Sequence, residues 1–206
     1  MKRETFVEYL KNHSQEIEEI ALTAIDLHKQ VGQTYDKHLP YGFHLSMVAE
    51  NAMKFGHLVI DDENDILPVV FGAYFHDTIE DARQTYNDIN GIAHKFMRTD
   101  QALIATEIVY ALTNDKGRTR AERAGERYYQ GIRETPYAPF VKLCDRMANM
   151  TYSFKETEDI NNRMQAVYES EWIHFKQAIT AENTDIRFSL PKEMLETVES
   201  LFTENR

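Results

Sequence analysis

The chain is organised around residues 67–81, which read Leu67-Pro-Val-Val-Phe-Gly-Ala-Tyr-Phe-His-Asp-Thr-Ile-Glu-Asp81. The apolar part of this segment, 67–75, predicts a buried helix that carries the polar part at its end. His76 and Asp77 offer a neutral imidazole and an anionic oxygen to one divalent cation. Glu80 and Asp81 follow about one helical turn later, ~5 Å away if the helix continues. Two carboxylates at that distance can handle a proton or orient a water molecule.

The remaining sequence predicts helices nearly throughout. Apolar residues recur at helical spacing over 17–28, with Ser14 placed as the N-cap and Gly32 as the end of the helix. Further helices are expected over 45–53, over 102–112 after a cap at Thr99-Asp100, over 119–132, from Pro136 and Pro139 onwards, around 172–179 and from Pro191. No stretch of useful length alternates apolar and polar residues as a β-strand does. We therefore expect an all-α helical bundle that forms a single domain over 1–206, with its motif core at about 20–155 and C-terminal helices, 156–206, packed on it.

Composition and charge argue against several classes of partner. The 206 residues are 42% hydrophobic and 11% aromatic, which is ordinary for a globular protein. No stretch approaches the roughly 20 apolar residues of a membrane span, so we expect no membrane partner. A net charge of −11, from 23 basic and 34 acidic residues, argues against nucleic-acid binding. It leaves room for a small anionic substrate, because a metal and a few cations can reverse the field inside one cleft.

The first residues and the cysteine content favour a cytoplasmic protein. Glu8 and Lys11 interrupt the N-terminal stretch, so we expect no signal peptide. A single cysteine, Cys144, excludes an internal disulfide and fits a reducing compartment. It lies in an apolar stretch without a neighbouring histidine, which predicts a buried filler rather than a nucleophile. The oligomeric state is left open.

Four residues are candidate metal ligands: His44, His76, Asp77 and Asp145. Each has a structural explanation when taken alone, such as an ordinary helix residue, an interaction with a helix dipole or an ion pair with a basic neighbour. Their agreement favours a metal, because an aspartate inside an apolar helix is costly unless it is paired or metal-bound. Two imidazoles and two carboxylates suit manganese, iron or a similar ion better than a structural zinc. The alternative for Glu80 and Asp81 is a solvated acidic helix end, which the helix dipole disfavours.

Several segments match a known pattern in their order along the chain: Ala24-Ile-Asp-Leu-His28 with Gly32-Gln33, Pro40-Tyr41-x-x-His44, Ala73-Tyr-Phe-His-Asp-Thr-Ile-Glu-Asp81, Leu112-Thr-Asn-Asp-Lys116 and Val141-Lys-Leu-Cys-Asp-Arg-Met-Ala-Asn149. With these segments the chain resembles the HD-domain metal-dependent phosphohydrolases. It is most similar to the hydrolase domain of the RelA/SpoT family and to the stand-alone small alarmone hydrolases. The resemblance covers roughly residues 20–155.

The resemblance implies a reaction and a set of roles. The implied reaction removes pyrophosphate from the 3′ position of guanosine tetra- or pentaphosphate, and some members remove the 2′-phosphate of NADPH. The four candidate ligands would hold Mn²⁺, while Glu80 and Asp81 would activate the attacking water. The implied substrate contacts are Tyr41, Lys142, Asn149 and Arg120, of which Arg120 stands where the family carries a phosphate-contacting lysine.

The sequence departs from the family at one place. Alarmone hydrolases usually show Gly-Gln-x-Arg-Lys, with the arginine stacked on guanine, whereas this chain reads Gly32-Gln33-Thr34-Tyr35-Asp36. Tyr35 can stack on a base, but the cation is lost and Asp36 adds an opposing charge. The departure bears on the guanine part of the substrate and leaves phosphate-ester hydrolysis untouched.

A local basic cluster lies downstream and consists of Lys116, Arg118, Arg120, Arg123 and Arg127. Arg120, Arg123 and Arg127 follow i, i+3, i+7 spacing and would share one face of a continuous helix. The cluster can serve an anionic substrate, and we take Lys116, Arg120 and Arg123 as candidate substrate contacts. The alternative is a solvated helix whose interleaved glutamates neutralise the arginines.

Other functions stay open beside alarmone hydrolysis. The first is an HD phosphatase that acts on another nucleotide, such as NADPH or a nucleoside monophosphate. The second is a catalytically silent HD domain that binds a nucleotide as a sensor, and the third is a helical scaffold without a metal. An acidic pair, Glu80 and Asp81, beside the ligand set favours an enzyme.

Overall fold

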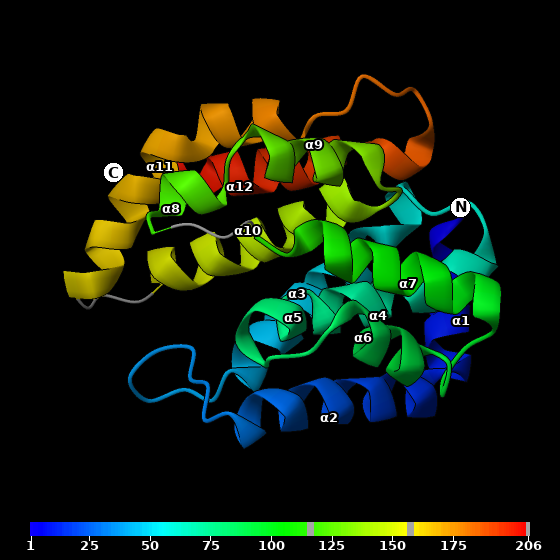
Figure 1. The fold of residues 1–206 in the computed structure, drawn as a ribbon. Helices are drawn as coiled ribbons and strands as arrows, with labels where there is room; N and C mark the ends of the chain where they lie inside the picture. Colours follow the sequence, from blue (N-terminus) through cyan, green and yellow to red (C-terminus); the bar gives the residue numbers. More distant parts are fainter. Residues whose placement is uncertain (115–117, 156–158, 205–206) are drawn as a thin grey trace.

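The structure is a computed structural model that describes residues 1–114, 118–155 and 159–204, without the side chains of 120, 121, 159–163 and 204. Helices dominate these residues, as the sequence predicts, and the fold is all-α (Figure 1). The helices, in chain order, are α1 (Arg3–Asn12), α2 (Ser14–Gln30), α3 (Gly42–Phe55), α4 (Ile66–Phe75), α5 (Thr78–Asp81), α6 (Tyr86–Ala93), α7 (Thr99–Leu112), α8 (Arg120–Arg123), α9 (Glu126–Glu134), α10 (Ala138–Lys155), α11 (Asp159–Ile179) and α12 (Lys192–Glu204). Short 3₁₀ turns lie at Gly56–Leu58, Glu63–Asp65 and Ile186–Phe188.

Helix α4 is the central element, because every one of its residues is buried. It packs against α2, α3 and α7. Pro68 lies in its first turn, where the missing N–H costs no helical hydrogen bond. The sequence 67–75 therefore forms the buried helix that its composition predicts, and it ends where the His-Asp pair begins.

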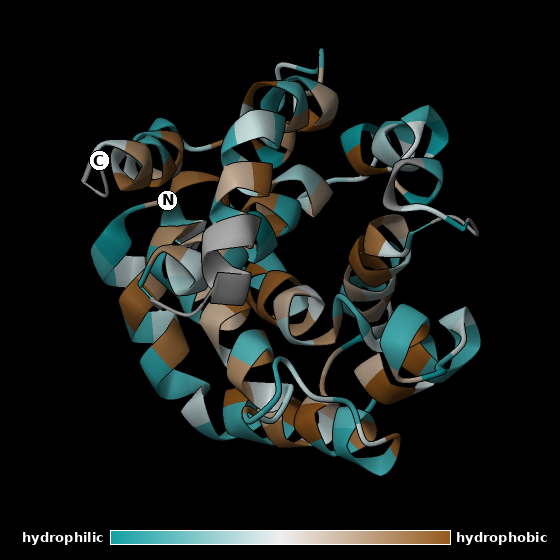
Figure 2. Cartoon of the chain, turned by 90° about the vertical axis from the view of Figure 1, so that its left-hand side faces the viewer, coloured by the Kyte–Doolittle hydropathy of each residue, from teal (hydrophilic) through white to brown (hydrophobic). Residues whose placement is uncertain are grey.

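Helix α10 connects the two halves of the bundle. It packs against α3 and α4 on one side and against α11 and α12 on the other, and Figure 1 shows α9, α11 and α12 beyond α10, opposite α2. Most helices have one hydrophilic and one hydrophobic face (Figure 2). The buried apolar residues form one cluster that runs from Phe6 in α1 to Val198 in α12. No helix in the described part of the chain combines the length and apolar composition that a membrane crossing needs.

Some helices begin and end where the sequence predicts, and others do not. Gly32, with φ +72°, ends α2 in the left-handed conformation that glycine adopts without strain. Ser14 lies inside α2 and is not its N-cap, because α1 runs almost directly into α2 and His13 holds the junction. Thr99 is likewise the first residue of α7, and the preceding backbone N–H, that of Arg98, is bound by the side chain of Gln101 at 3.3 Å.

Residues 119–132 are largely helical, as predicted, but they form two helices and not one continuous helix. Helix α8 ends at Arg123, and α9 starts at Glu126 after an extended Gly125 with φ −82° and ψ −179°. Glycine has the lowest helix propensity after proline, which explains the break. Arg127 lies in α9 and does not share one continuous helix with Arg123. Lys116 and the side chain of Arg120 lie outside the described residues.

The contact between α4 and α7 depends on a glycine. A Cβ added at Gly72 would lie 2.6 Å from Cγ2 of Ile108, close to the branch point of that side chain. We expect Gly72→Ala to lower the free energy of unfolding by about 1–3 kcal/mol, because an overpacked core must shift. Urea denaturation measures this change.

The matched control is Gly91→Ala in α6, where a Cβ meets nothing within 4 Å. That variant should be neutral or more stable by up to about 1 kcal/mol, since alanine favours helix. Equal stability of both variants would mean that α4 and α7 separate without cost.

Candidate metal centre

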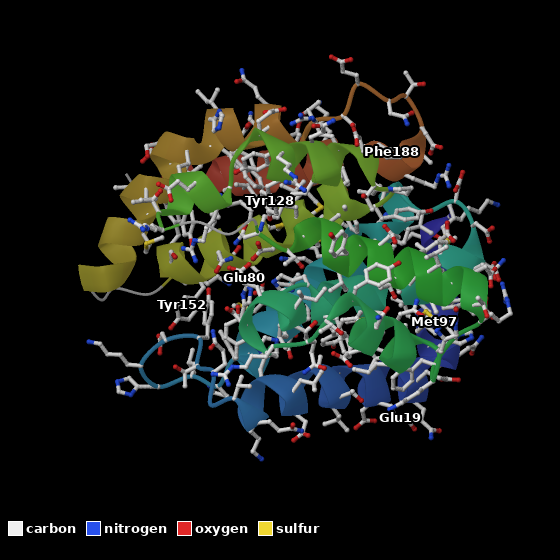
Figure 3. The ribbon with its side chains drawn as sticks, in the orientation of Figure 1. Glu19, Glu80, Met97, Tyr128, Tyr152 and Phe188 are labelled. Atoms are coloured by element: carbon white, nitrogen blue, oxygen red, sulfur yellow. The ribbon has the colours of Figure 1, made fainter. Side chains whose placement is uncertain are left out.

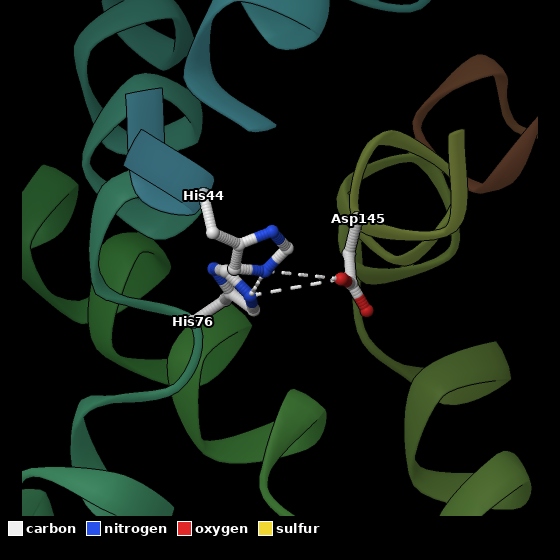
Figure 4. A group of neighbouring side chains, drawn as sticks. All are labelled: His44, His76 and Asp145. Atoms are coloured by element: carbon white, nitrogen blue, oxygen red, sulfur yellow. Dashed lines mark hydrogen bonds and ion pairs between the residues drawn. The ribbon is translucent and has the colours of Figure 1, made fainter. Parts of the chain in front are cut away.

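Three predicted ligands meet between three helices. His44 comes from the first turn of α3, His76 follows the last residue of α4, and Asp145 lies in α10 (Figure 4). All three are buried, with 2%, 1% and 8% of their surfaces exposed. His44 Nε2 lies 3.3 Å from His76 Nε2 and 3.4 Å from Asp145 Oδ1, and His76 Nε2 lies 3.9 Å from the same oxygen. Atoms that share one ion at about 2.0–2.2 Å are about 3–4 Å apart, so these separations suit a single ion.

Asp77, the fourth predicted ligand, lies beside this group. Its Oδ2 is 2.9 Å from His76 Nε2 and 3.7 Å from His44 Nε2. The hydroxyl of Tyr41 donates a hydrogen bond to the same oxygen. The carboxylate of Asp77 therefore faces the two histidines and is also held by a tyrosine from the turn before α3.

The end of α4 fixes the orientation of His76. Its Nδ1 lies 2.9 Å from the carbonyl oxygen of Ala73, one of the carbonyls that a helix leaves without a partner at its C-terminus. Since a carbonyl only accepts, Nδ1 carries a proton, and Nε2 is the ring nitrogen that faces the cluster and would bind a metal after losing its own proton. Metal-binding histidines are commonly oriented by such a contact.

The buried carboxylates favour positive charge at the centre of the cluster. Burial would lower the pKa of His76, but Asp77 and then Asp145 outweigh it and raise that pKa to about 9. Burial would raise the pKa of Asp77, yet His76 holds it well below its usual value. The pKa of Asp145 is likewise low despite burial, because Lys142 and the two histidines surround it. The donor atoms of His44, His76 and Asp145 and their field therefore fit a metal ion.

Glu80 and Asp81 lie on the short helix α5, which the His76-Asp77 turn separates from α4. Asn114 Nδ2 donates to both carboxylate oxygens of Glu80, at 2.8 and 3.0 Å, and Arg123 Nη1 lies 3.9 Å away. Gln33 Nε2 donates to Asp81 at 3.1 Å. Burial, followed by the charges of Asp77 and Glu80, raises the pKa of Asp81 to about 6.

The cluster opens into a cleft of about 620 Å³, within the range of small-molecule sites. Two residues of its lining, Glu80 on α5 and Tyr128 on α9, are labelled in Figure 3. The predicted site residues in its wall are Tyr41, His44, Asp77, Glu80, Asp81, Arg123, Lys142, Asp145 and Asn149. Two other substrate contacts were predicted, Lys116 and Arg120. Lys116 lies outside the described residues, and so does the side chain of Arg120.

Lys142 is a close neighbour of the ligands. Its Nζ lies 2.9 Å from Asp145 Oδ2, whereas Oδ1 of the same carboxylate faces the two histidines. Burial would lower the pKa of Lys142, but Asp145 and Tyr128 raise it above its usual value. A permanent cation is thereby fixed at the edge of the cluster.

Helix α11 supplies a wall that the sequence motifs do not include. Arg146 Nη1 lies 3.1 Å from Glu171 Oε2, and the guanidinium lies 4.3 Å from the ring centre of Phe175 and 4.9 Å from that of Tyr168. All four line the cleft. The i, i+3, i+7 spacing of Tyr168, Glu171 and Phe175 is the signal in the sequence that could have found this face.

His28 is a second residue whose surroundings the motifs do not reveal. It is fully buried in α2, and its ring stacks on Tyr41 with centroids 4.5 Å apart. Burial lowers the pKa of His28 to about 4, so the imidazole is neutral at physiological pH. His28 thus supports Tyr41 from behind as an uncharged ring.

No model of a known protein family and no curated protein matches this chain.

Removal of one ligand tests the cluster directly. Wild-type protein should bind Mn²⁺, and at 100 times the dissociation constant the ion should add about 2.7 kcal/mol to the free energy of unfolding. Asp145→Ala should weaken binding by more than about 100-fold, because loss of a ligand exceeds the 10–100-fold cost of losing an outer partner. Electron paramagnetic resonance of free Mn²⁺ measures binding.

His94→Ala serves as the control, since His94 is exposed at the end of α6. It should bind Mn²⁺ like the wild type. Equal Mn²⁺ affinity of Asp145→Ala and wild type would remove Asp145 from the ligand set.

Proposed function

We propose that this chain is a metal-dependent phosphohydrolase of the HD-domain type that acts on a nucleotide. The observation that carries the proposal is the buried group of His44, His76 and Asp145, which opens with Asp77 into a cleft. A group of this kind that served stability alone would gain nothing from an opening. The acidic pair Glu80 and Asp81 lies in the wall of the same cleft, where hydrolysis needs proton acceptors.

The proposed reaction transfers a phosphoryl group to water. A bound divalent metal lowers the pKa of a water molecule and polarises a phosphoryl oxygen. The water oxygen bonds to phosphorus, the ester P–O bond breaks, and the leaving oxygen takes a proton. Glu80, held by Asn114, receives the proton that the water loses, and Asp81, held by Gln33, lies beside it in the cleft wall.

Cations in the cleft wall act on the phosphoryl oxygens. Lys142 lies at the cluster itself, and Arg123 lies near Glu80. Positive groups fixed in place stabilise the charge that develops on the phosphoryl oxygens without reorganising during the reaction. This arrangement supports hydrolysis of a phosphate ester more strongly than binding alone.

The first candidate substrate is guanosine tetra- or pentaphosphate, cleaved at its 3′-pyrophosphate, because the motifs resemble the alarmone hydrolases. A less charged nucleotide is the second candidate. Two observations favour it: Tyr35 replaces the expected arginine, and the described wall carries five carboxylates, Asp77, Glu80, Asp81, Asp145 and Glu171, against three fixed cations, Arg123, Lys142 and Arg146. A divalent metal would bring this wall close to neutrality but not to a strong positive charge.

A panel of nucleotides assayed with Mn²⁺ and with a chelator tests the proposal. Release of pyrophosphate from the guanosine 3′-pyrophosphates supports the first candidate, and release of orthophosphate from NADPH or a nucleoside monophosphate supports the second. Tight binding of a nucleotide without metal-dependent release of either product would mean a sensor and would contradict hydrolysis.

Glu80→Gln separates chemistry from metal binding. The variant keeps the size of the side chain and one oxygen that can accept from Asn114, but it loses the base, so kcat should fall by about 10²–10⁴-fold while Mn²⁺ affinity stays within about twofold. Glu19→Gln, on the exposed side of α2 (Figure 3), is the matched control and should keep the wild-type rate. Full activity of Glu80→Gln would deny Glu80 a role in proton transfer.

A further inference from the structure

Tyr35 lies against the candidate metal centre instead of projecting into solvent. It belongs to the segment 31–41 between α2 and α3. Its ring is stacked on the ring of His44, with centroids 4.9 Å apart and planes 6° from parallel. The rings of Phe43 and Tyr152 lie 6.2 and 4.9 Å from it. One face of the ring is therefore in contact with a candidate metal ligand.

The hydroxyl of Tyr35 reaches a second ligand through one residue. It donates to Asn149 Oδ1 at 2.9 Å, and Asn149 Nδ2 donates to Asp145 Oδ1 at 2.6 Å. An amide has one accepting and one donating end, so a donor on the oxygen side fixes the N–H side towards the carboxylate. Asp145 Oδ1 is the oxygen that faces both histidines. The tyrosine hydroxyl thus sets the orientation of the ligand oxygen.

Tyr35 also contacts Tyr41, the residue whose hydroxyl donates a hydrogen bond to Asp77. The edge of its ring meets Tyr41, with centroids 6.4 Å apart and planes at 72°. Tyr41 in turn donates to Asp77 and is supported from behind by the buried His28. Tyr35 therefore contacts His44 directly, and it is connected to Asp145 through Asn149 and to Asp77 through Tyr41.

The segment that carries Tyr35 is tied down on both sides of it. Gln33 donates to Asp81 at 3.1 Å, and Asp36 accepts a hydrogen bond from the hydroxyl of Tyr152. Asp36 also accepts from the backbone N–H groups of His38 and Leu39, at 2.8 and 3.3 Å, which closes the turn. These contacts hold the backbone around Tyr35 against α5 and α10.

We propose that Tyr35 is a positioning residue of the metal centre. Its hydroxyl orients Asn149 and through it Asp145, and its ring covers His44. The inference rests on the proposed function only in requiring that the cluster bind a metal. In this role Tyr35 serves the ligand set.

The test compares metal binding by two variants with the wild type. Tyr35→Phe keeps the ring over His44 and removes the hydroxyl, and it should weaken Mn²⁺ binding about tenfold, as loss of an outer partner does. Tyr35→Ala removes the ring as well and should weaken binding further. Titration with Mn²⁺ followed by electron paramagnetic resonance gives the affinities, and the visible absorption of the Co²⁺-loaded protein reports a changed ligand geometry.

Two further variants make the result specific. Tyr110→Phe removes a hydroxyl from an exposed tyrosine on α7 and should bind Mn²⁺ like the wild type. If the hydroxyl acts through Asn149, the double variant Tyr35→Phe/Asn149→Ala should bind no more weakly than Asn149→Ala alone. Circular dichroism of the metal-free proteins checks that each variant is folded.

Each outcome separates this inference from the proposed function. Wild-type affinity and an unchanged Co²⁺ spectrum in Tyr35→Phe would overturn the role of Tyr35 and leave the metal site standing. Absence of Mn²⁺ and Co²⁺ binding by the wild type would overturn both. Additive losses in the double variant would refute the path through Asn149. Metal binding that weakens in Tyr35→Phe while no nucleotide is hydrolysed would support the inference and contradict only the phosphohydrolase.

Discussion

The buried charge where α3, α4 and α10 meet is the constraint on which the rest of the structure depends. An ionised carboxylate in an apolar interior is strongly unfavourable unless partners surround it. Asp145 has Lys142 and Asn149 as partners, and Asp77 has His76 and Tyr41. Lys142 and Asn149 share α10 with Asp145, whereas His44 and His76 approach Asp145 Oδ1 from α3 and α4, at 3.4 and 3.9 Å. Bringing the two histidines to Asp145 therefore requires the two halves of the bundle to close on each other. The packing of α10 against α3 and α4 is the structural counterpart of that requirement.

Sequence reasoning works for the parts of the molecule in which local pattern and tertiary structure agree. The all-α class follows from helical periodicity, and α4 follows from an apolar run that no exposed helix would tolerate. The meeting of His44, His76 and Asp145 is also predictable, because polar residues inside apolar helices need partners. The break at Gly125 was missed, since charged residues on both sides have a helical pattern and only the glycine weakens it.

The parts that escaped prediction depend on contacts rather than on pattern. Tyr35 lies in a segment without periodicity, so nothing in the sequence indicates that its ring turns towards His44. The wall formed by α11 lies beyond the matched motifs, and its link to the cleft is the pairing of Arg146 with Glu171. Both features concern the surroundings of the reacting groups, which are shaped by tertiary packing. They shape the space beside the cluster, whereas the motifs supply the cluster itself.

The complete burial of α4 has a consequence for how such a protein can diversify. A helix without an exposed face cannot tilt or slide without disturbing its neighbours on every side. The end of α4, which carries His76 and Asp77 and forms the floor of the cleft, is therefore fixed. The rim of the cleft is built differently, from the segment 31–41 and from one face of α11, and both have residues in contact with solvent. Replacements on that rim can change the shape offered to an incoming molecule while the floor keeps its geometry. Under the proposed function, new substrate preferences can therefore arise at the rim at little cost to folding.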